Sequence, residues 1–170
     1  MRFKLLYPDI YVDSVMDIPL ESLHRKKIAS FILDLDNTVT EWNSNHLSPE
    51  IRGWVQKVKG AGGKACIVSN NSDQRVRGVA QVLDIPYVCR AGKPRRRAFR
   101  RALELMGTGP DQTAVVGDQI FTDILGGNRM GMVTILVTPL AKREFLGTRI
   151  TRQLERLVLK RLKGPGCPEL

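Results

Sequence analysis

Residues 30–42 read SFILDLDNTVTEW, which places two aspartates, Asp34 and Asp36, directly after an apolar run. A short apolar run bounded by polar residues is typical of a strand that is covered on both faces. We therefore expect a buried strand over 28–33, with both aspartates at its carboxyl end. Ligands bind at that edge of an open α/β sheet. Two carboxylates so close in sequence repel each other unless a cation or a proton relieves them, so the stretch indicates a functional site.

Short apolar segments alternate with helical patterns along the rest of the chain. Ser48, Pro49 and Glu50 are typical of a helix start, and Gly131 is typical of a helix end. Strands are expected at 64–69, 87–89, 114–116 and 132–137, and helices at 49–60, 74–83, 95–106 and 120–129. Strands and helices that alternate with short turns predict an α/β fold, with a parallel sheet and helices on both faces.

The 170 residues suit a single domain, which we divide into four parts. Residues 1–27 show no sustained period, and we expect an irregular or partly helical arm packed on the domain. Residues 28–138 form the predicted catalytic core. Residues 148–163 have an apolar stripe flanked by Lys and Arg, which predicts an amphipathic basic helix. Residues 164–170 are expected to be a disordered tail.

The chain is basic, with 27 Lys and Arg against 17 Asp and Glu, a formal net charge of +10. Such an excess favours an anionic partner, namely nucleic acid, an acidic membrane or a phosphorylated substrate. The most basic helix, 95–106, is predicted to turn Ala98, Ala102, Leu105 and Met106 inward. Its arginines are interleaved with one aromatic residue, Phe99, which is thin support for binding nucleic acid. We interpret this basic face as exposed to solvent.

Targeting signals and cysteine content favour a reduced, cytoplasmic setting. Pro8 and Asp9 interrupt the N-terminal apolar residues before a signal-peptide core accumulates, and no apolar run approaches the roughly 20 residues of a membrane span. Cys66, Cys89 and Cys167 are odd in number and lack metal-type spacing. We therefore expect a soluble protein whose contact with a membrane, if any, is peripheral.

Polar residues follow each predicted strand of the core. In a parallel sheet the carboxyl ends of the strands share one edge, so these side chains should converge. Four carboxylates at one place require a hard divalent cation, and oxygen ligands suit Mg²⁺, although Mn²⁺ accepts the same ligands. A lysine and a hydroxyl beside the cation suit a phosphate group. The converging residues are Asp34, Asp36, Ser69, Lys93, Asp118 and Asp123.

The sequences DLDNT, SNN, KP and GDQIFTD, in this order, resemble the four motifs of haloacid-dehalogenase (HAD) superfamily phosphatases. The resemblance covers about 28–137. The arm YPDIYVDSVMDI, Trp42 and the segment TPL…GTRITRQLER resemble the YqeG-type branch of subclass IIIA, which is similar to phosphatidylglycerophosphate phosphatases. The resemblance to HAD phosphatases implies a HAD-like (Rossmannoid) fold. The segments between the motifs are too short for a cap domain, so we expect an open site without one.

The resemblance also implies a role for each motif residue. Asp34 would be the nucleophile that becomes an aspartyl-phosphate, and Asp36 would be the general acid and then the base for water. Ser69 and Asn70 would bind the phosphoryl group, with Lys93 balancing its charge. The Mg²⁺ ligands would be Asp34, Asp118, the backbone carbonyl of Asp36 and, as ligand or supporting residue, Asp123.

The substrate implied by the resemblance is a lipid phosphate, phosphatidylglycerophosphate, met at the inner face of an anionic membrane. A phosphoprotein or a nucleic-acid end is an alternative that keeps the same chemistry. A nucleic-acid-binding module on a HAD scaffold is an alternative of another class, and the intact motif set argues against it. The sequence does not define an oligomeric state.

Overall fold

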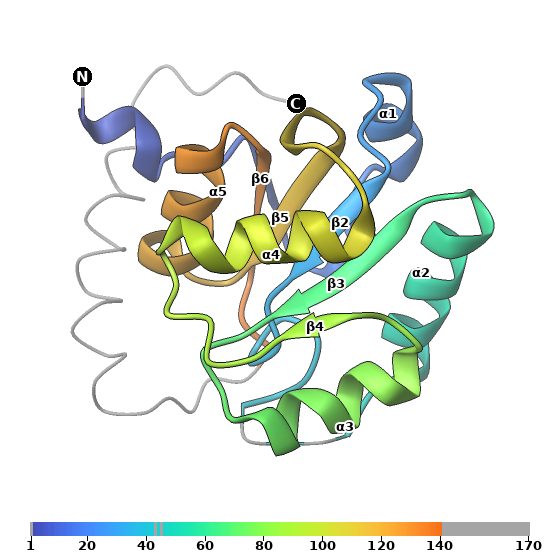
Figure 1. The fold of residues 1–170 in the computed structure, drawn as a ribbon. Helices are drawn as coiled ribbons and strands as arrows, with labels where there is room; N and C mark the ends of the chain where they lie inside the picture. The colour runs from blue at the N-terminus through green and yellow to red at the C-terminus, as the bar shows by residue number, and fades with distance from the viewer. Residues whose placement is uncertain (1, 43, 45, 141–170) are drawn as a thin grey trace.

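A six-stranded, wholly parallel sheet forms the centre of the molecule, in the order β1-β6-β5-β2-β3-β4 (Figure 1). The structure is a computed structural model that describes residues 2–42, 44 and 46–140. The predicted parallel α/β fold is confirmed. The C-terminal helix predicted at 148–163 and the tail predicted at 164–170 lie outside the described residues.

The strands are short, and the α-helices are 6 to 12 residues long. The strands are β1 (Ile10–Val12), β2 (Ser30–Leu33), β3 (Lys64–Val68), β4 (Tyr87–Val88), β5 (Thr113–Gly117) and β6 (Val133–Val137). The α-helices are α1 (Leu20–Arg25), α2 (Pro49–Gly60), α3 (Asp73–Leu83), α4 (Arg96–Met106) and α5 (Leu125–Met130). Short 3-10 helices lie at Arg2–Leu6, Val15–Asp17 and Pro110–Gln112, and a π-helical turn at Ile120–Ile124 precedes α5.

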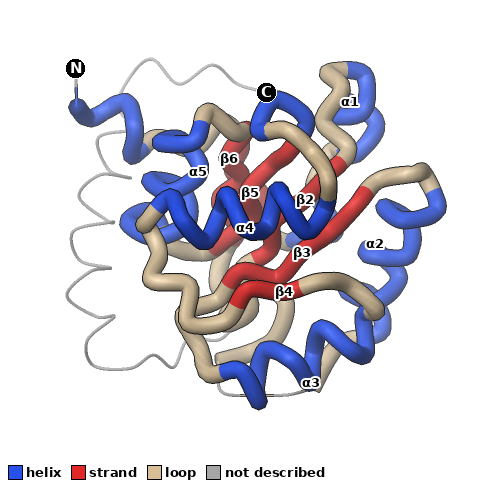
Figure 2. Tube along the Cα trace, in the orientation of Figure 1, coloured by secondary structure: helices blue, strands red, loops and turns tan. Residues whose placement is uncertain are grey.

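Helices cover both faces of the sheet, with α4 and α5 on one face and α2 and α3 on the other (Figure 2). Successive side chains of a strand point to opposite faces. Phe31 and Leu33 accordingly belong to the core beneath α2 and α3, whereas Ile32 packs with Phe99 of α4. All four residues of β2 are buried, as expected for a strand in the middle of a covered parallel sheet.

The order of the strands places a crevice at the carboxyl ends of β2 and β5. From β2 the chain continues outward to β3 and β4, and then returns to the other side of β2 to form β5 and β6. Adjacent strands whose connections leave in opposite directions open a crevice where ligands bind. Asp34 follows β2 and Asp118 follows β5 at this point.

The predicted helix start at Ser48 is confirmed, since the Ser48 hydroxyl accepts a hydrogen bond from the Ile51 amide at 3.3 Å. Gly131, in the left-handed conformation, caps the C-terminus of α5, and the predicted helix end at this residue is confirmed. In α4, by contrast, the inward placement of Leu105 is wrong. Leu105 is exposed, and Phe99 and Leu103 are buried instead. The buried face of α4 is wider than the single stripe read from the sequence.

The N-terminal arm contributes a sixth strand that the sequence analysis did not predict. β1 pairs with β6 at the edge of the sheet. Asp9, just before β1, holds this edge: its amide donates to the Thr134 carbonyl at 2.9 Å, and its carboxylate accepts from the Thr134 amide at 2.8 Å. The three-residue strand depends on this distant partner.

The connections after β2 and β3 contain no inserted domain in the part of the chain that the structure describes, which agrees with the predicted absence of a cap. Over the same residues, no helix has the length and apolar character needed to span a membrane.

Candidate active site

Asp34 lies at the carboxyl end of β2 with its carboxylate buried. Its Oδ1 accepts a hydrogen bond from the Leu35 amide at 2.7 Å and lies 2.7 Å from the Lys93 ammonium nitrogen. Burial raises the pKa of Asp34 to about 7; the Lys93 charge opposes this increase and the Asp123 charge adds to it. The group is therefore a carboxylate whose charge depends on a cationic neighbour.

Lys93 provides that neighbour from the loop after β4. Its Nζ lies 2.7 Å from Oδ1 of both Asp34 and Asp123, and its side chain is 2% exposed. Burial lowers the pKa of the Lys93 ammonium, but the Asp123 and Asp34 charges outweigh it and raise the pKa above its ordinary value. The Lys93 backbone amide donates to Asn70 Oδ1 at 2.8 Å, which ties this loop to the loop after β3.

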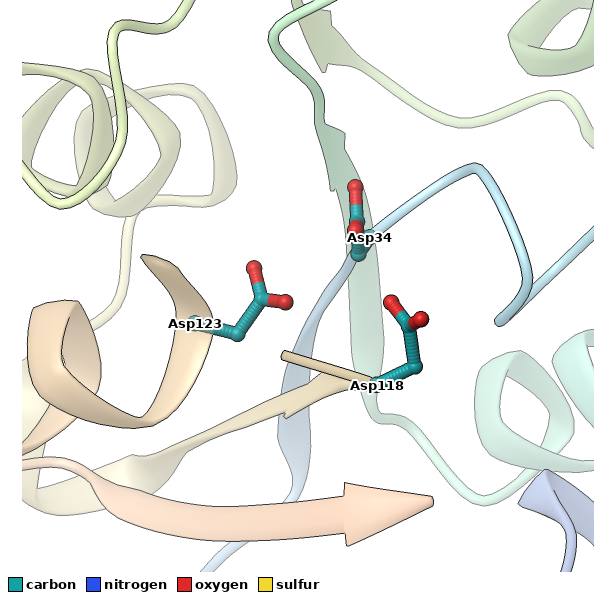
Figure 3. A group of neighbouring side chains, drawn as sticks. All are labelled: Asp34, Asp118 and Asp123. Atoms are coloured by element: carbon teal, nitrogen blue, oxygen red, sulfur yellow. The ribbon is translucent and has the colours of Figure 1, made fainter. Parts of the chain in front are cut away.

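Three carboxylates lie together at the carboxyl ends of β2 and β5 (Figure 3). One oxygen from each of Asp34, Asp118 and Asp123 lies within 4.8 Å of the other two, and all three residues are buried. A buried group of hard oxygen ligands of net negative charge fits a divalent cation such as Mg²⁺. The structure thus brings together three of the four carboxylates predicted to converge.

Asp123 reaches the cluster from the π-helical turn because Gly117 has no side chain. A Cβ at position 117 would lie 2.3 Å from the Asp123 carboxyl carbon. The Asp123 carboxylate also accepts from the Thr122 hydroxyl at 3.2 Å and from the Gln119 amide at 3.4 Å. The glycine of the GDQIFTD segment therefore makes room for the carboxylate six residues later.

The Asp36 carboxylate points to other partners. Its Oδ1 accepts a hydrogen bond from the guanidinium of Arg75, and its Oδ2 accepts from the Asn71 side-chain amide. It is not a member of the three-carboxylate group. This arrangement leaves the Asp36 backbone carbonyl as the atom predicted to contribute to cation binding, and that contribution stays a prediction.

A pocket of about 190 Å³ opens beside these groups. Ser69 is buried in its wall, and the Ser69 hydroxyl accepts from the Asn71 amide at 3.2 Å. Asn70 also borders the pocket, although its side-chain oxygen is used by the Lys93 amide. The lining residues are Asp34, Asp36, Asn37, Trp42, Ser69, Asn70, Asn71, Lys93, Gln119 and Thr122. A larger, mainly apolar pocket of about 390 Å³ lies near the amino end of β2, away from the carboxylates.

Three features of this site were not predicted from the sequence: Arg75, Gly117 and the lining residues Gln119 and Thr122. The sequence did contain a signal for Arg75. A cation in the first turn of a helix is unfavourable next to the helix dipole, so an arginine there indicates that a carboxylate lies nearby to compensate. No local pattern marked Gly117, because a side chain is excluded there by the carboxylate of Asp123, which approaches from a later turn.

Two protein-family models match the chain. The model described as "Mitochondrial PGP phosphatase" matches residues 1–81, and the model described as "HAD-hydrolase-like" matches residues 90–144. The first covers Asp34, Asp36 and Ser69, and the second covers Lys93, Asp118 and Asp123. HAD phosphatases generally use a divalent metal ion, in keeping with the buried carboxylates.

Relatives extend over nearly the whole chain. The chain is 40% identical to "Probable phosphatase YqeG" of Bacillus subtilis over 98% of its own length and 96% of that protein. It is 28% identical to "Phosphatidylglycerophosphate phosphatase 1, chloroplastic/mitochondrial" of Arabidopsis thaliana over 94% of this chain, which spans 48% of the plant protein.

A solved structure supports the fold. The cobalt-bound form of deoxy-D-mannose-octulosonate 8-phosphate phosphatase from Haemophilus influenzae superposes with a TM-score of 0.54 at 13% identity, covering 79% of this chain and 89% of that one. The fold, the full-length similarity to YqeG and the two family models agree with one another. The chain belongs to the HAD superfamily of phosphatases, in the branch that contains YqeG.

Proposed function

We propose that the chain is a Mg²⁺-dependent phosphomonoester hydrolase that forms an aspartyl-phosphate on Asp34 and acts on phosphatidylglycerophosphate. The observation that carries the chemistry is the buried Asp34 carboxylate at a pocket wall, with the Lys93 ammonium 2.7 Å from its Oδ1. Because Oδ1 is held by Leu35 and Lys93, Oδ2 is the oxygen assigned to attack phosphorus.

The reaction has two steps. Asp34 Oδ2 attacks phosphorus, the bond from phosphorus to the substrate oxygen breaks, and Asp36 gives that oxygen a proton. Water then attacks the aspartyl-phosphate and gives a proton to Asp36, and Asp34 is released with inorganic phosphate. Ser69 and Lys93 hold the phosphoryl oxygens. Phosphoryl transfer depends mainly on such positioning and on electrostatic stabilisation.

Asp34, Asp118 and Asp123 would hold the cation, with the Asp36 carbonyl as a further ligand. Their three oxygens within 4.8 Å of one another support this assignment. Bound there, Mg²⁺ would offset the negative charge of the carboxylates and of the phosphate. The oxygen ligands suit both Mg²⁺ and Mn²⁺, so the choice of Mg²⁺ is itself part of the proposal.

The lipid substrate is supported by the similarity to the Arabidopsis phosphatidylglycerophosphate phosphatase and by the shape of the site. A pocket of about 190 Å³ accommodates a phosphate head, and the described connections after β2 and β3 carry no inserted domain that would enclose the rest of a bulky substrate. The net charge of +10 favours peripheral contact with an anionic bilayer, with the enzyme on the cytoplasmic side.

The position of Phe99 argues against nucleic-acid binding through α4, because this aromatic residue is fully buried under the helix. Base stacking requires an exposed aromatic face. The phosphoprotein and nucleic-acid-end substrates keep the same chemistry and are separated from the lipid by experiment.

The test compares phosphate release from phosphatidylglycerophosphate in mixed micelles, phosphopeptides and end-phosphorylated oligonucleotides, with and without Mg²⁺. The lipid should be turned over fastest, chelation should stop turnover, and Asp34→Asn should lower it by a factor of at least about 10⁴. Activity that survives Asp34→Asn contradicts the assigned nucleophile. Faster turnover of the peptide or the oligonucleotide contradicts the lipid assignment and leaves the chemistry intact.

A further inference from the structure

The contact between Asp36 and Arg75 joins three segments that are distant in the sequence. Asp36 lies in the loop after β2, Asn71 in the loop after β3, and Arg75 in the first turn of α3. The Asp36 and Arg75 side chains are only 18% and 13% exposed. Each oxygen of the Asp36 carboxylate has its own donor, so both the position and the plane of the carboxylate are fixed.

The position of Arg75 is unfavourable for α3 itself. It is the third residue of the helix, where the partial positive charge of the helix N-terminus repels a cation. Taking the guanidinium largely out of water adds a further cost. The helix already has the favourable acid there, Asp73, which pairs with the exposed Arg77. The ion pair with Asp36 is a contact that offsets these costs at position 75.

The backbone at Asp36 is also held from the other side. The Leu35 carbonyl accepts hydrogen bonds from the Val39 and Thr40 amides, each at 3.0 Å, and Asn37 adopts a left-handed conformation with φ 59°. This tight loop defines where the Asp36 Cα lies, and Arg75 and Asn71 then define where its carboxylate lies. Among the described residues, Asp36 and Asn71 line the pocket and Arg75 does not.

We propose that Arg75 is a positioning residue, which holds the Asp36 carboxylate at the pocket wall so that Asp36 can protonate the leaving oxygen of the substrate. The inference deepens the proposed function and rests on it. Arg75 touches no substrate and acts through Asp36. A planar guanidinium suits this task because its donors match a carboxylate in one orientation, whereas an ammonium group supplies charge without that geometry.

If Arg75 acts through Asp36, the effect of replacing Arg75 depends on the leaving group of the substrate. A poor leaving group, such as the alkoxide of an alkyl phosphate, needs a proton as its bond to phosphorus breaks, whereas p-nitrophenolate leaves without one. A misplaced Asp36 therefore slows the first step for alkyl phosphates and hardly affects p-nitrophenyl phosphate. A change that merely damaged the fold would slow both substrates by the same factor.

The experiment measures kcat/KM, which reports the first step, for p-nitrophenyl phosphate and for glycerol phosphate. Arg75→Met should lower the value for glycerol phosphate about 100-fold, at the lower end of typical contributions from general acid catalysis, and that for p-nitrophenyl phosphate less than about fivefold. Added guanidinium should restore glycerol phosphate turnover by the variant. Arg77→Met, two residues along the same helix and outside the pocket, is the matched control and should change neither value.

Equal losses for the two substrates, or no loss for either, overturn the inference. If Arg75→Met fails to fold, Arg75→Lys carries the test, because it keeps the charge and loses the planar fork. A loss for glycerol phosphate that exceeds the loss for p-nitrophenyl phosphate is then expected, and equal losses contradict the role of Arg75. Failure of the proposed function appears separately, as turnover that persists in Asp34→Asn.

Discussion

Two ion pairs in this molecule have nearly the same nitrogen–oxygen distance but opposite surroundings. Lys93 Nζ lies 2.7 Å from the Asp34 carboxylate, and Lys59 Nζ lies 2.8 Å from the Asp84 carboxylate. The first pair is buried, with side chains 2% and 8% exposed, whereas Asp84 is 91% exposed and Lys59 is 31% exposed. Distance alone therefore does not distinguish them.

The difference lies in what replaces water. At the surface, solvent already stabilises both charges, and an ion pair adds little. At the end of β2 the charges have lost their water, so removing one partner leaves the others uncompensated. Lys93 serves two carboxylates, Asp34 and Asp123, and this makes the buried group sensitive to every change in its charge.

The largest effect is expected for Lys93→Met. Loss of the ammonium removes a charge that would stabilise the phosphoryl group, and we expect kcat/KM to fall about 10³-fold. Without added metal ions, two buried carboxylates lose their cation, and the free energy of unfolding should fall by about 3 kcal/mol. Urea unfolding monitored by circular dichroism measures the second quantity. A variant of normal stability and activity would show that the buried group resembles the surface pair.

The second effect is a dependence of stability on pH. The pKa of Asp34 is raised from 3.8 to about 7, so between these values the folded metal-free protein binds a proton that the unfolded chain has released. Asp34 should therefore make stability fall as pH rises from about 4 to 7, by at most about 1.4 kcal/mol per pH unit.

The measurement is the difference in unfolding free energy between the wild-type protein and Asp34→Asn, followed over this range of pH in the presence of chelator. The Asn side chain does not titrate, so the difference reports the charge of residue 34 together with its effect on Lys93 and Asp123. Saturating Mg²⁺ should flatten the difference because a cation favours the carboxylate. If the wild-type protein became more stable relative to Asp34→Asn as pH rose in the presence of chelator, the raised pKa of Asp34 would be contradicted.

A smaller effect is expected for Gly117→Ala. The new Cβ would lie 2.3 Å from the Asp123 carboxyl carbon, so the carboxylate must move away from the cluster. We expect a loss of about 1–3 kcal/mol in unfolding free energy and a higher Mg²⁺ concentration at half-maximal activity. The matched control is Gly78→Ala, in the exposed middle of α3 with no atom within 4 Å of the added Cβ, which should be neutral or stabilising. Equal behaviour of the two variants would contradict the role of Gly117.

The smallest effect is expected for Lys59→Met. The Lys59 partner is exposed, so the midpoint of thermal unfolding and the phosphatase activity should match those of the wild-type protein within error. High salt should change the wild-type midpoint no more than that of the variant. A clear loss of stability would show that distance, and not burial, governs both ion pairs.

Local patterns predicted much of this molecule. The apolar run before Asp34 predicted β2, and the Ser48 and Gly131 signals predicted helix ends that the structure contains. Such features depend on neighbouring residues. Leu105 was predicted to face inward together with Ala98, Ala102 and Met106. It is exposed, and the buried face of α4 extends instead to Phe99 and Leu103. The period of a helix alone does not show how wide its buried face is.

The sequence by itself determined that polar, chemically active residues follow the strands of a parallel α/β sheet, because strand pattern, turn residues and motif order are local properties. The tertiary structure decided which of the residues predicted to converge form one group. It kept Asp34, Asp118 and Asp123 together, and it turned the Asp36 side chain to Arg75 instead. It also added β1 through Asp9 and Thr134. These contacts join residues distant along the chain, and packing and desolvation, which no local pattern encodes, select them.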